Sequence, residues 1–222
     1  AIAANITQLV VVLACRPEPG GYMSDQYLIA AELIGVRGLI CLNKADLLDE
    51  EARSHFRERF AHYETIGYPV IQISAKTEHG LDPLREHLRG ETSILVGQSG
   101  VGKSSLINAL LPRQQVLEGS LSAATGLGRH TTSAATLYQL DNGGELIDSP
   151  GVRSFRLGEL TRQELERGFR EFAPFLGQCR FHNCAHLAEP GCAIRAAVKA
   201  GRVRPERLES YQHMVTSTGD NS

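Results

Sequence analysis

The residue pattern with the clearest chemistry is a loop, Gly97-Gln98-Ser99-Gly100-Val101-Gly102-Lys103-Ser104. Its G-x-x-x-x-G-K-S spacing is typical of a phosphate-binding loop, in which backbone N–H groups turn toward phosphate oxygens and glycines allow close approach. In such a loop Lys103 reaches the β and γ phosphates, and the hydroxyl of Ser104 takes one magnesium position. The sequence therefore predicts a nucleoside triphosphate site here.

The segments on either side of this loop support the same interpretation. Before it, residues 94–96 form a β-type run, and after it residues 105–111 follow a helical pattern that begins with Ser105. This order directs the positive N-terminus of a helix at the phosphates. A glycine-rich turn that matches by chance is the alternative, and the order of strand, loop and helix argues against it.

A second motif, Asn43-Lys44-Ala45-Asp46, follows a strand pattern at residues 38–42 and is suited to selecting guanine. The Asp46 carboxylate can accept hydrogen bonds from guanine N1–H and from the exocyclic amine, whereas adenine would leave it unpaired. We expect Asn43 to bind the Hoogsteen edge of the base and the stem of Lys44 to lie along its plane. The alternative is a helix cap after a strand.

A third motif, Ser74-Ala75-Lys76, follows the next strand pattern at residues 69–73. We expect the backbone N–H of Ala75 to meet guanine O6, with Ser74 and Lys76 shaping the loop. Because ligand loops leave the carboxyl ends of the strands in a parallel sheet, this motif would lie beside Asn43. The pairing of the two motifs favours base recognition over the helix-cap alternative.

Two further groups are suited to the γ phosphate and to magnesium. Asp148 supplies a carboxylate for a magnesium-bound water, and Gly151 supplies an N–H for the γ oxygens. The alternative is a plain β-turn, which the segment Asp-Ser-Pro-Gly from Asp148 to Gly151 also favours. Thr131 or Thr132 offers a hydroxyl for magnesium, and the pattern does not decide between them. We assign Ser104, Thr132 and Asp148 to Mg²⁺.

The residue that orients the attacking water is not evident from the motifs. Ras-like enzymes place a glutamine directly after the glycine of the last motif, and Val152 stands there in this chain. His130 is the candidate, because imidazole can hydrogen-bond water near neutral pH. An exposed loop histidine without this role is the alternative. The predicted catalytic set is Lys103, His130, Asp148 and Gly151.

Three of the five cysteines, Cys179, Cys184 and Cys192, cluster near the C-terminus around His182 and His186. Three sulfurs and one imidazole form a complete tetrahedral set for Zn²⁺, and no position remains open for catalysis. The spacing therefore predicts a structural zinc site with either histidine as the fourth ligand. Buried free thiols are the alternative, but a small polar segment has little core to hold them.

Charge is spread unevenly along the 222 residues. The formal net charge is −2, of which residues 1–150 carry −5 and residues 151–222 carry +3, so any affinity for a polyanion belongs to the last third. Five basic residues there fit an RNA-facing surface and a solvated helix face equally well. They are Arg195, Lys199, Arg202, Arg204 and Arg207. No apolar run is long enough to span a membrane, and the first residues lack the basic region of a signal peptide. We therefore expect a cytoplasmic protein that acts without a membrane.

Apolar runs and helical patterns alternate up to residue 111, which predicts an α/β domain with a mostly parallel sheet and ligand loops at strand ends. Beyond a stretch of little periodicity, Asp141-Asn142-Gly143-Gly144 predicts a β-hairpin. From residue 159 the pattern becomes helical and charged. We place the domain boundary near Leu157, which gives domains at residues 1–157 and 158–222.

The motifs occur in an unusual order, with the base motifs before the phosphate loop, as expected of a circularly permuted sheet. Together with the cysteine cluster, this layout resembles the RsgA (YjeQ) family of circularly permuted GTPases, which act in late assembly of the bacterial small ribosomal subunit. The resemblance covers nearly all of the chain. It favours His186 as the zinc ligand and ribosomal RNA as the partner of the basic residues. Full-length members also carry an N-terminal OB-fold, to which nothing here corresponds, so we expect this chain to be the GTPase and zinc portion.

The resemblance implies a circularly permuted P-loop GTPase domain followed by a small, mainly helical zinc-binding domain. It implies hydrolysis of GTP to GDP and phosphate with Mg²⁺, slow for the protein alone and stimulated by the small subunit and its rRNA, and we expect a monomer. The alternative is a zinc-dependent RNA-binding module for which GTP is a regulatory ligand that is not turned over. The predicted nucleotide-binding set is Asn43, Lys44, Asp46, Ser74, Ala75, Lys76, Gly97, Gln98, Ser99, Gly100, Val101, Gly102, Lys103, Ser104, Ser105, Thr131 and Thr132.

Overall fold

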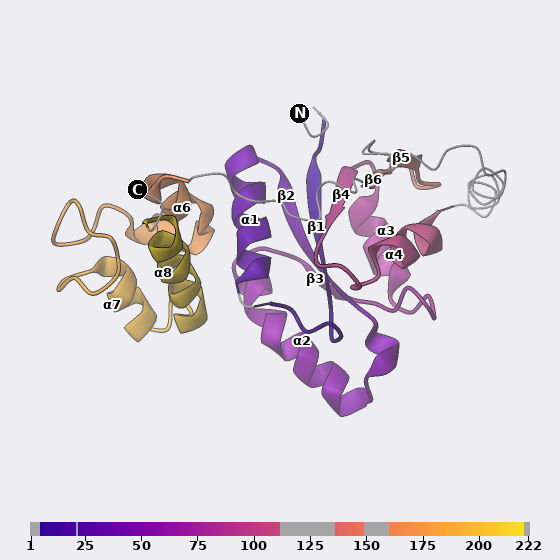
Figure 1. The fold of residues 1–222 in the computed structure, drawn as a ribbon, viewed down its shortest axis with the longest axis horizontal. Coiled ribbons are helices and arrows are strands. Elements are labelled where there is room, and N and C mark those ends of the chain that lie inside the picture. Colours follow the sequence, from indigo (N-terminus) through magenta and orange to yellow (C-terminus); the bar gives the residue numbers. More distant parts are fainter. Residues whose placement is uncertain (1–4, 21, 112–135, 149–159, 220–222) are drawn as a thin grey trace. The chain divides into compact units, whose positions relative to one another are not determined.

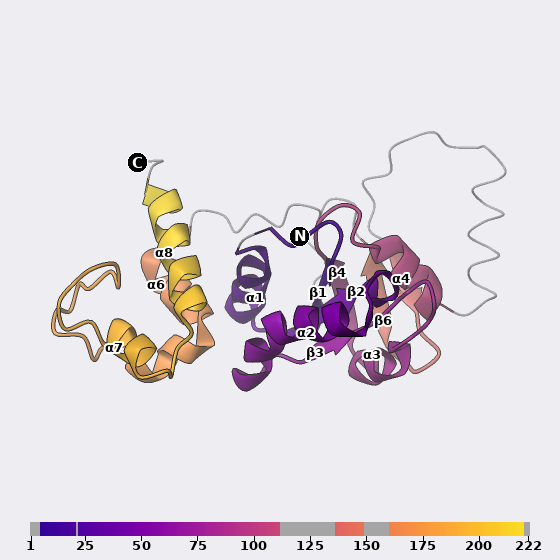
Figure 2. The same ribbon diagram turned by 90° about the horizontal axis from the view of Figure 1, so that it is seen from below.

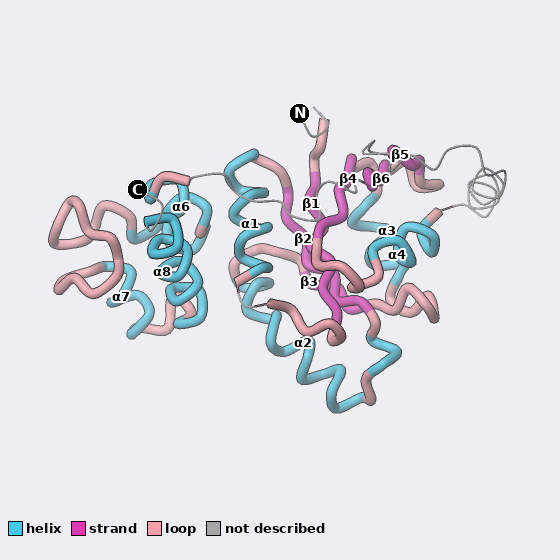
Figure 3. The backbone as a smooth tube through the Cα atoms, in the orientation of Figure 1, coloured by secondary structure: helices cyan, strands magenta, loops and turns pink. Residues whose placement is uncertain are grey.

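The computed structural model describes residues 5–20, 22–111, 136–148 and 160–219 (Figures 1 and 3). Contacts within the chain divide it into two compact units. The sheet unit comprises Ala1–Pro19 and Arg37–Phe155, and the helical unit comprises Gly20–Val36 and Arg156–Ser222. Among the described helices, none combines the length and the apolar character that a membrane crossing requires.

The sheet unit is built on six described strands in the order β3-β2-β1-β4-β6-β5. Neighbouring strands are parallel, except that β5 runs antiparallel to β6 as the other arm of a hairpin. The mostly parallel α/β sheet and the hairpin predicted from the sequence are both confirmed. The strands are β1 (Gln8–Ala14), β2 (Arg37–Asn43), β3 (Val70–Gln72), β4 (Thr92–Val96), β5 (Thr136–Gln139) and β6 (Glu145–Asp148).

Strand β1 lies at the centre of this sheet, and all of its residues are buried. Val11 pairs with Ile40 of β2 on one side and with Val96 of β4 on the other. A strand that is covered on both faces can be apolar at every position, which explains the unbroken apolar run of the sequence. The parallel register brings the carboxyl ends of β1, β2 and β4 to one edge, where the predicted ligand loops begin.

Helices α3 (Leu81–Leu88) and α4 (Lys103–Leu110) cover one face of the sheet and lie side by side (Figures 1 and 2). Leu84 of α3 and Leu106 of α4 belong to the same buried core as Val10 of β1. The buried residues of each helix recur at three- and four-residue spacing, so each helix presents one apolar face. This packing fixes the N-terminus of α4 beside the carboxyl edge of the sheet.

Two further helical segments follow β2. The short 3₁₀ turn η1 (Ala45–Leu47) carries Asp46, and the long helix α2 spans Glu50–Thr65. The Asp49 side chain caps α2 by accepting a 2.9 Å hydrogen bond from the backbone N–H of Ala52. The buried face of α2 carries Phe56, Phe60 and Tyr63.

The helical unit contains helix α1 from the first part of the chain together with the C-terminal helices. In its core, the rings of Phe169, Phe172 and Tyr211 contact one another. The elements are α1 (Met23–Ile34), α6 (Arg162–Gly168), the 3₁₀ segment η3 (Arg170–Phe175), α7 (Ala193–Lys199) and α8 (Pro205–Gly219).

Helix α1 packs closely against α6. A Cβ atom at Gly168 would lie only 2.4 Å from Cγ2 of Ile29, so glycine is needed where the two helices touch. The division into residues 1–157 and 158–222 stays a prediction, and α1, which lies within the first of these ranges, groups by its contacts with the helical unit.

Arg207 of α8 is buried in the helical unit, with 1% of its surface exposed. Its guanidinium pairs with Asp25 of α1 and, at 2.5 Å, with Glu171 of η3, and it lies 4.5 Å from the ring centroid of Phe169. The prediction that Arg207 belongs to an RNA-facing surface is therefore wrong, because its charge is neutralised inside the unit. Lys199, Arg202 and Arg204 are exposed, and Arg195 is half-buried.

Candidate functional site

The phosphate-loop motif leaves β4 at Gly97 and enters α4 at Lys103. Gly97, Gly100 and Gly102 all have positive φ angles, of 141°, 83° and 95°, a backbone region that favours glycine. A Cβ atom at Gly97 would lie 2.2 Å from the carbonyl oxygen of Val12 in β1, which leaves no room for a side chain. The Lys103 Nζ atom donates 2.7 Å hydrogen bonds to the carbonyl oxygens of Gly97 and Gln98, so its ammonium lies over the loop.

Asn43, the last residue of β2, is buried and connects two of the predicted motifs. Its Nδ2 donates a 2.9 Å hydrogen bond to the carbonyl oxygen of Val101, and its Oδ1 accepts a 3.0 Å bond from the backbone N–H of Ala75. A Cβ atom at Gly102 would lie 2.5 Å from Asn43 Nδ2, which is a second reason, besides its positive φ, why this position requires glycine. Asn43 therefore holds the phosphate loop against the segment that carries Ala75.

Lys44 makes a second connection from the base motif. Its backbone is left-handed, with φ 65°, and its Nζ atom donates to the carbonyl oxygens of Gly100 at 2.6 Å and Arg16 at 2.8 Å. The sequence motifs do not predict the part played by Arg16. Backbone carbonyls carry no side-chain signature, so only the meeting of three loops at one edge identifies this contact.

Asp46 is positioned by the third motif. The Ser74 hydroxyl donates a 2.6 Å hydrogen bond to Asp46 Oδ1 and accepts a 3.1 Å bond from the backbone N–H of Thr77. Ser74 is 1% exposed, whereas Asp46 is half-buried. A buried hydroxyl thus fixes the Asp46 carboxylate, while part of the Asp46 residue stays accessible.

A cavity of about 370 Å³ lies at this edge of the sheet. Its size falls within the range of small-molecule sites, roughly 300–1,000 Å³. It is lined by residues of all three motifs, namely Asn43, Lys44, Asp46, Ala75, Lys76, Gly102 and Ser105, and by Leu47. Leu47 is 54% exposed and supplies an apolar wall that the motifs do not predict; in the sequence its only signal is its place directly after Asp46.

The remaining nucleotide-site predictions fall at the neighbouring strand or outside the described residues. Ile147 of β6 pairs with Ile94 of β4 in the parallel register, so Asp148 ends its strand at the edge from which the phosphate loop leaves. Ser104 is exposed in the first turn of α4. The residues that lie outside the described part of the chain are His130, Thr131, Thr132 and Gly151.

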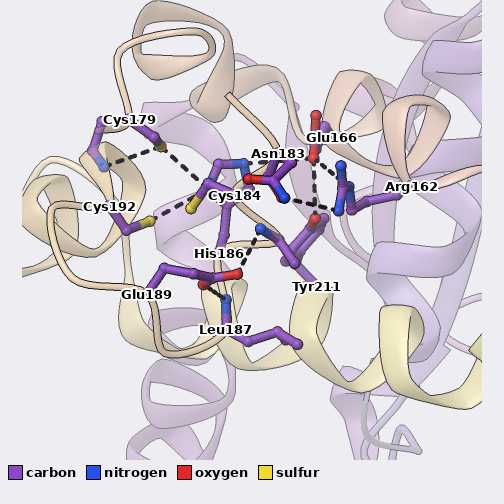
Figure 4. Close-up of polar contacts among 12 residues, drawn as sticks. Arg162, Glu166, Cys179, Asn183, Cys184, His186, Leu187, Glu189, Cys192 and Tyr211 are labelled. Atoms are coloured by element: carbon purple, nitrogen blue, oxygen red, sulfur yellow. Dashed lines mark hydrogen bonds and ion pairs between the residues drawn. The ribbon is translucent and has the colours of Figure 1, made fainter. Parts of the chain in front are cut away.

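The predicted metal ligands of the helical unit come together in space (Figure 4). The Sγ atoms of Cys179, Cys184 and Cys192 and an imidazole nitrogen of His186 lie within 4.8 Å of one another. His186 Nδ1 is 3.6 Å from the sulfurs of Cys179 and Cys184 and 3.3 Å from that of Cys192. Ligand atoms around a tetrahedral zinc ion stand about 3.5 Å apart, so the residues present fit Zn²⁺. His182 is exposed and does not join the cluster.

The electrostatics of the cluster fit a cation as well. Burial raises the pKa of the Cys184 thiol to about 12 and also raises the pKa of Cys192, while burial lowers the pKa of His186. Three thiolates confined to this volume require a positive charge between them, which a divalent ion supplies. Two sulfurs also accept backbone N–H groups, from Ala193 to Cys179 at 3.3 Å and from Arg195 to Cys192 at 3.5 Å.

The family described as RsgA GTPase matches residues 1–158. The chain belongs to the RsgA GTPase family. The predicted family is thereby confirmed.

Relatives of known sequence agree with this RsgA assignment. The chain is 50% identical to the small ribosomal subunit biogenesis GTPase RsgA of Pseudomonas aeruginosa strain LESB58, over 97% of this chain and 64% of that protein. It is 48% identical to the protein of the same name from Azotobacter vinelandii, over 97% of this chain and 63% of that protein. The chain thus spans less than two thirds of the length of these RsgA relatives.

Solved structures give the same result. YjeQ from Thermotoga maritima matches with a TM-score of 0.80 and 35% identity, over 96% of this chain and 72% of that one. YloQ, described as a circularly permuted GTPase, matches with a TM-score of 0.75 and 30% identity, over 98% of this chain and 70% of that one. The permuted order of motifs predicted for this RsgA chain is confirmed by these matches.

Proposed function

We propose that this chain binds GTP at the carboxyl edge of its sheet and hydrolyses it to GDP and phosphate. The observation that carries the proposal is a cavity of about 370 Å³ whose walls include both the base motifs and the end of the phosphate loop. A base at one end of that cavity places its phosphates over Gly97–Ser104 and against the N-terminus of α4. Membership of the RsgA GTPase family supports the same activity.

In the proposed complex, each motif binds a different part of the nucleotide. The Asp46 carboxylate accepts from guanine N1–H and the exocyclic amine, and the Ser74 hydroxyl holds that carboxylate in place. The Asn43 and Lys44 side chains fix the phosphate loop relative to the base site. Because the loop is held before the ligand arrives, little ordering is needed on binding.

On the phosphate side, the Lys103 ammonium lies over the loop and is placed to move from the carbonyls of Gly97 and Gln98 to β and γ oxygens. Ser104, Asp148 and Thr132, or Thr131 in place of Thr132, are the proposed holders of Mg²⁺. When bound, that ion neutralises charge that develops on the transferred phosphoryl group.

Two residues outside the described part of the chain complete the proposed catalytic set. The backbone N–H of Gly151 would bind the γ phosphate, and His130 is proposed to orient the attacking water, since Val152 replaces the usual glutamine. With no glutamine at that position, turnover by the protein alone should be slow.

The proposed partner is the small ribosomal subunit with its rRNA. The relatives are named small ribosomal subunit biogenesis GTPases, and the helical unit exposes the cations Lys199, Arg202 and Arg204. The test is the rate of phosphate release as a function of the concentration of isolated small subunits. Stimulation of a slow basal rate supports the proposal. Tight GTP binding with no phosphate release in either condition supports the zinc-dependent RNA-binding module instead.

We propose further that Cys179, Cys184, His186 and Cys192 hold a structural Zn²⁺. The four ligand atoms already stand at separations that suit a tetrahedral ion, and a complete protein ligand set leaves no position for substrate. Elemental analysis of the purified protein tests this proposal. One zinc per chain, lost when Cys184→Ser and Cys192→Ser are combined, is the expected result.

A further inference from the structure

Glu166 of α6 lies beside the proposed metal ligand His186 but is not itself a member of the ligand cluster (Figure 4). Its Oε1 atom is 3.6 Å from Nε2 of His186. The side chains are 16% and 5% exposed, respectively. The carboxylate therefore faces the side of the imidazole ring opposite to the one that faces the three sulfurs.

The two ring nitrogens of His186 have separate surroundings. Nδ1 stands 3.3 to 3.6 Å from the three cysteine sulfurs, whereas Nε2 points to Glu166. For Nδ1 to offer a lone pair to a metal, the ring proton must be on Nε2. A carboxylate at Nε2 favours that tautomer and makes Nδ1 a better donor. The 3.6 Å separation exceeds the roughly 3.0 Å of an ordinary hydrogen bond, so the contact in this geometry is electrostatic.

Glu166 is held in place by two neighbours. The Tyr211 hydroxyl donates to Glu166 Oε1 at 3.4 Å, and Arg162 Nε, one turn earlier on α6, is 3.4 Å from the same oxygen. Tyr211 is fully buried, so its hydroxyl has little freedom to turn elsewhere. Arg162 also donates a 3.3 Å bond to the carbonyl oxygen of Asn183, directly before Cys184.

The backbone around His186 is fixed from a second helix. Gln212 of α8 donates through Nε2 to the carbonyl oxygens of His186 at 2.7 Å and Leu187 at 3.1 Å. His186 itself has a left-handed backbone with φ 60°, which a non-glycine residue adopts only where its surroundings impose it. The loop and the ring of His186 are thus oriented by side chains from α8 and α6.

We propose that Glu166 is the positioning residue of the metal centre: it fixes the ring orientation and tautomer of His186 for binding through Nδ1. This inference rests on the zinc site proposed above. It makes α6, which contributes no ligand, part of the metal centre. Removal of such outer carboxylates typically lowers metal affinity 10- to 100-fold.

The experiment measures the zinc dissociation constant of the full chain by competition with a chromophoric chelator. We expect Glu166→Ala to raise this constant about 10- to 100-fold. Glu166→Gln keeps the shape of the side chain and an oxygen that can accept from Nε2–H, so it should give a smaller rise. Glu209→Gln removes the same charge from an exposed position of α8 and should match the wild type.

A second readout separates positioning from general destabilisation. In the zinc-loaded wild type, ¹⁵N NMR should show His186 metal-bound at Nδ1, with an Nε2–H proton that exchanges slowly. In Glu166→Ala that proton should exchange faster, and in Glu166→Gln it should be partly protected. Wild-type zinc affinity and an unchanged His186 signal in Glu166→Ala would overturn the inference and leave the zinc site standing. Failure of the wild type itself to bind zinc would overturn both.

Discussion

The Lys44 Nζ atom donates a 2.6 Å hydrogen bond to the carbonyl oxygen of Gly100. The residue that follows Asn43 is thereby joined to the centre of the phosphate loop. A second bond from the same ammonium, to the carbonyl of Arg16 at 2.8 Å, adds the loop after β1. One cation therefore connects three loops at the carboxyl edge of the sheet. Its loss should weaken the binding of both the base and the phosphates of a nucleotide.

Replacement of Lys44 tests this connection. Hydrogen bonds to charged groups contribute about 1.5–3 kcal/mol, so Lys44→Met should weaken GTP binding about 10- to 100-fold. GDP should weaken by the same factor, because neither contact involves the γ phosphate. Titration calorimetry with both nucleotides measures this, and Lys199→Met, at an exposed position of α7, is the control. A loss confined to GTP would contradict the explanation.

Asp46→Asn should change the base that is bound. The Ser74 hydroxyl can still donate to the oxygen of the new amide, so the NH₂ group would be directed at the base, where it opposes the N–H donors of guanine. A loss of GTP affinity of about 100-fold or more is expected, together with a gain for xanthosine triphosphate, which presents a carbonyl at that edge. Competition binding with the two nucleotides gives the measurement. Unchanged preference for GTP would remove Asp46 from the base site.

Arg207→Met should destabilise the helical unit. It removes the guanidinium that pairs with the buried carboxylates of Asp25 and Glu171, a change that typically costs about 3–5 kcal/mol. Urea unfolding followed by tyrosine fluorescence would measure it. The matched variant Arg204→Met removes an exposed arginine three residues earlier and should shift stability by no more than about 0.5 kcal/mol. Equal effects of the two variants would show that Arg207 is not an internal charge.

Glu145 should contribute to the acid sensitivity of the sheet unit. Hydrogen bonds from Gln139 of β5 and Thr92 of β4 lower the pKa of Glu145 below its ordinary value. A carboxyl group with a lowered folded-state pKa stabilises the fold above its unfolded pKa, about 4.3, and this contribution is lost as pH falls through the folded value. Between pH 3 and pH 6, the thermal unfolding midpoint of Glu145→Gln should therefore fall less steeply with decreasing pH than that of the wild type. If the midpoints of the variant and the wild type fell in parallel, Glu145 would not be a source of the acid sensitivity.

Chelation of the proposed zinc should affect the two units differently. Without a metal, the cysteines of the cluster protonate and the four-ligand loop loses its cross-link, so the helical unit should unfold or loosen. The contacts that build the proposed nucleotide site all lie within the sheet unit, and GTP binding should persist. Limited proteolysis and nucleotide titration before and after treatment with a chelator test both statements. Loss of GTP binding in step with zinc would show that the units depend on each other.

The parts of the fold that the sequence predicted well are those whose determinants are close together in the chain. The strand, loop and helix around Gly97–Ser104 lie within a short segment, and the hairpin of β5 and β6 turns at Asp141–Gly144. The metal cluster is also local, since its ligands span Cys179 to Cys192. In each case the residue types that impose the geometry stand beside the residues that use it.

Contacts between distant segments could not be predicted in this way. Arg207 and Arg204 look alike in the sequence, yet Arg207 is buried because Asp25, 182 residues earlier, lies opposite it. Glu166 gives no signal either, because a helical Glu one turn after an arginine usually marks a solvated pair. Only the packing of α6 against the metal loop reveals its contact with His186.

The grouping of α1 with the C-terminal helices has a practical consequence for anyone who wishes to divide this protein. A fragment cut after residue 157 would retain Ile29 and Asp25 but lose Gly168 and Arg207, so the apolar face of α1 and the Asp25 carboxylate would lose the groups that pack against them. We expect such a fragment to aggregate through this exposed apolar face, although it contains the whole of the proposed nucleotide pocket. A single cut in the chain therefore cannot separate the two units.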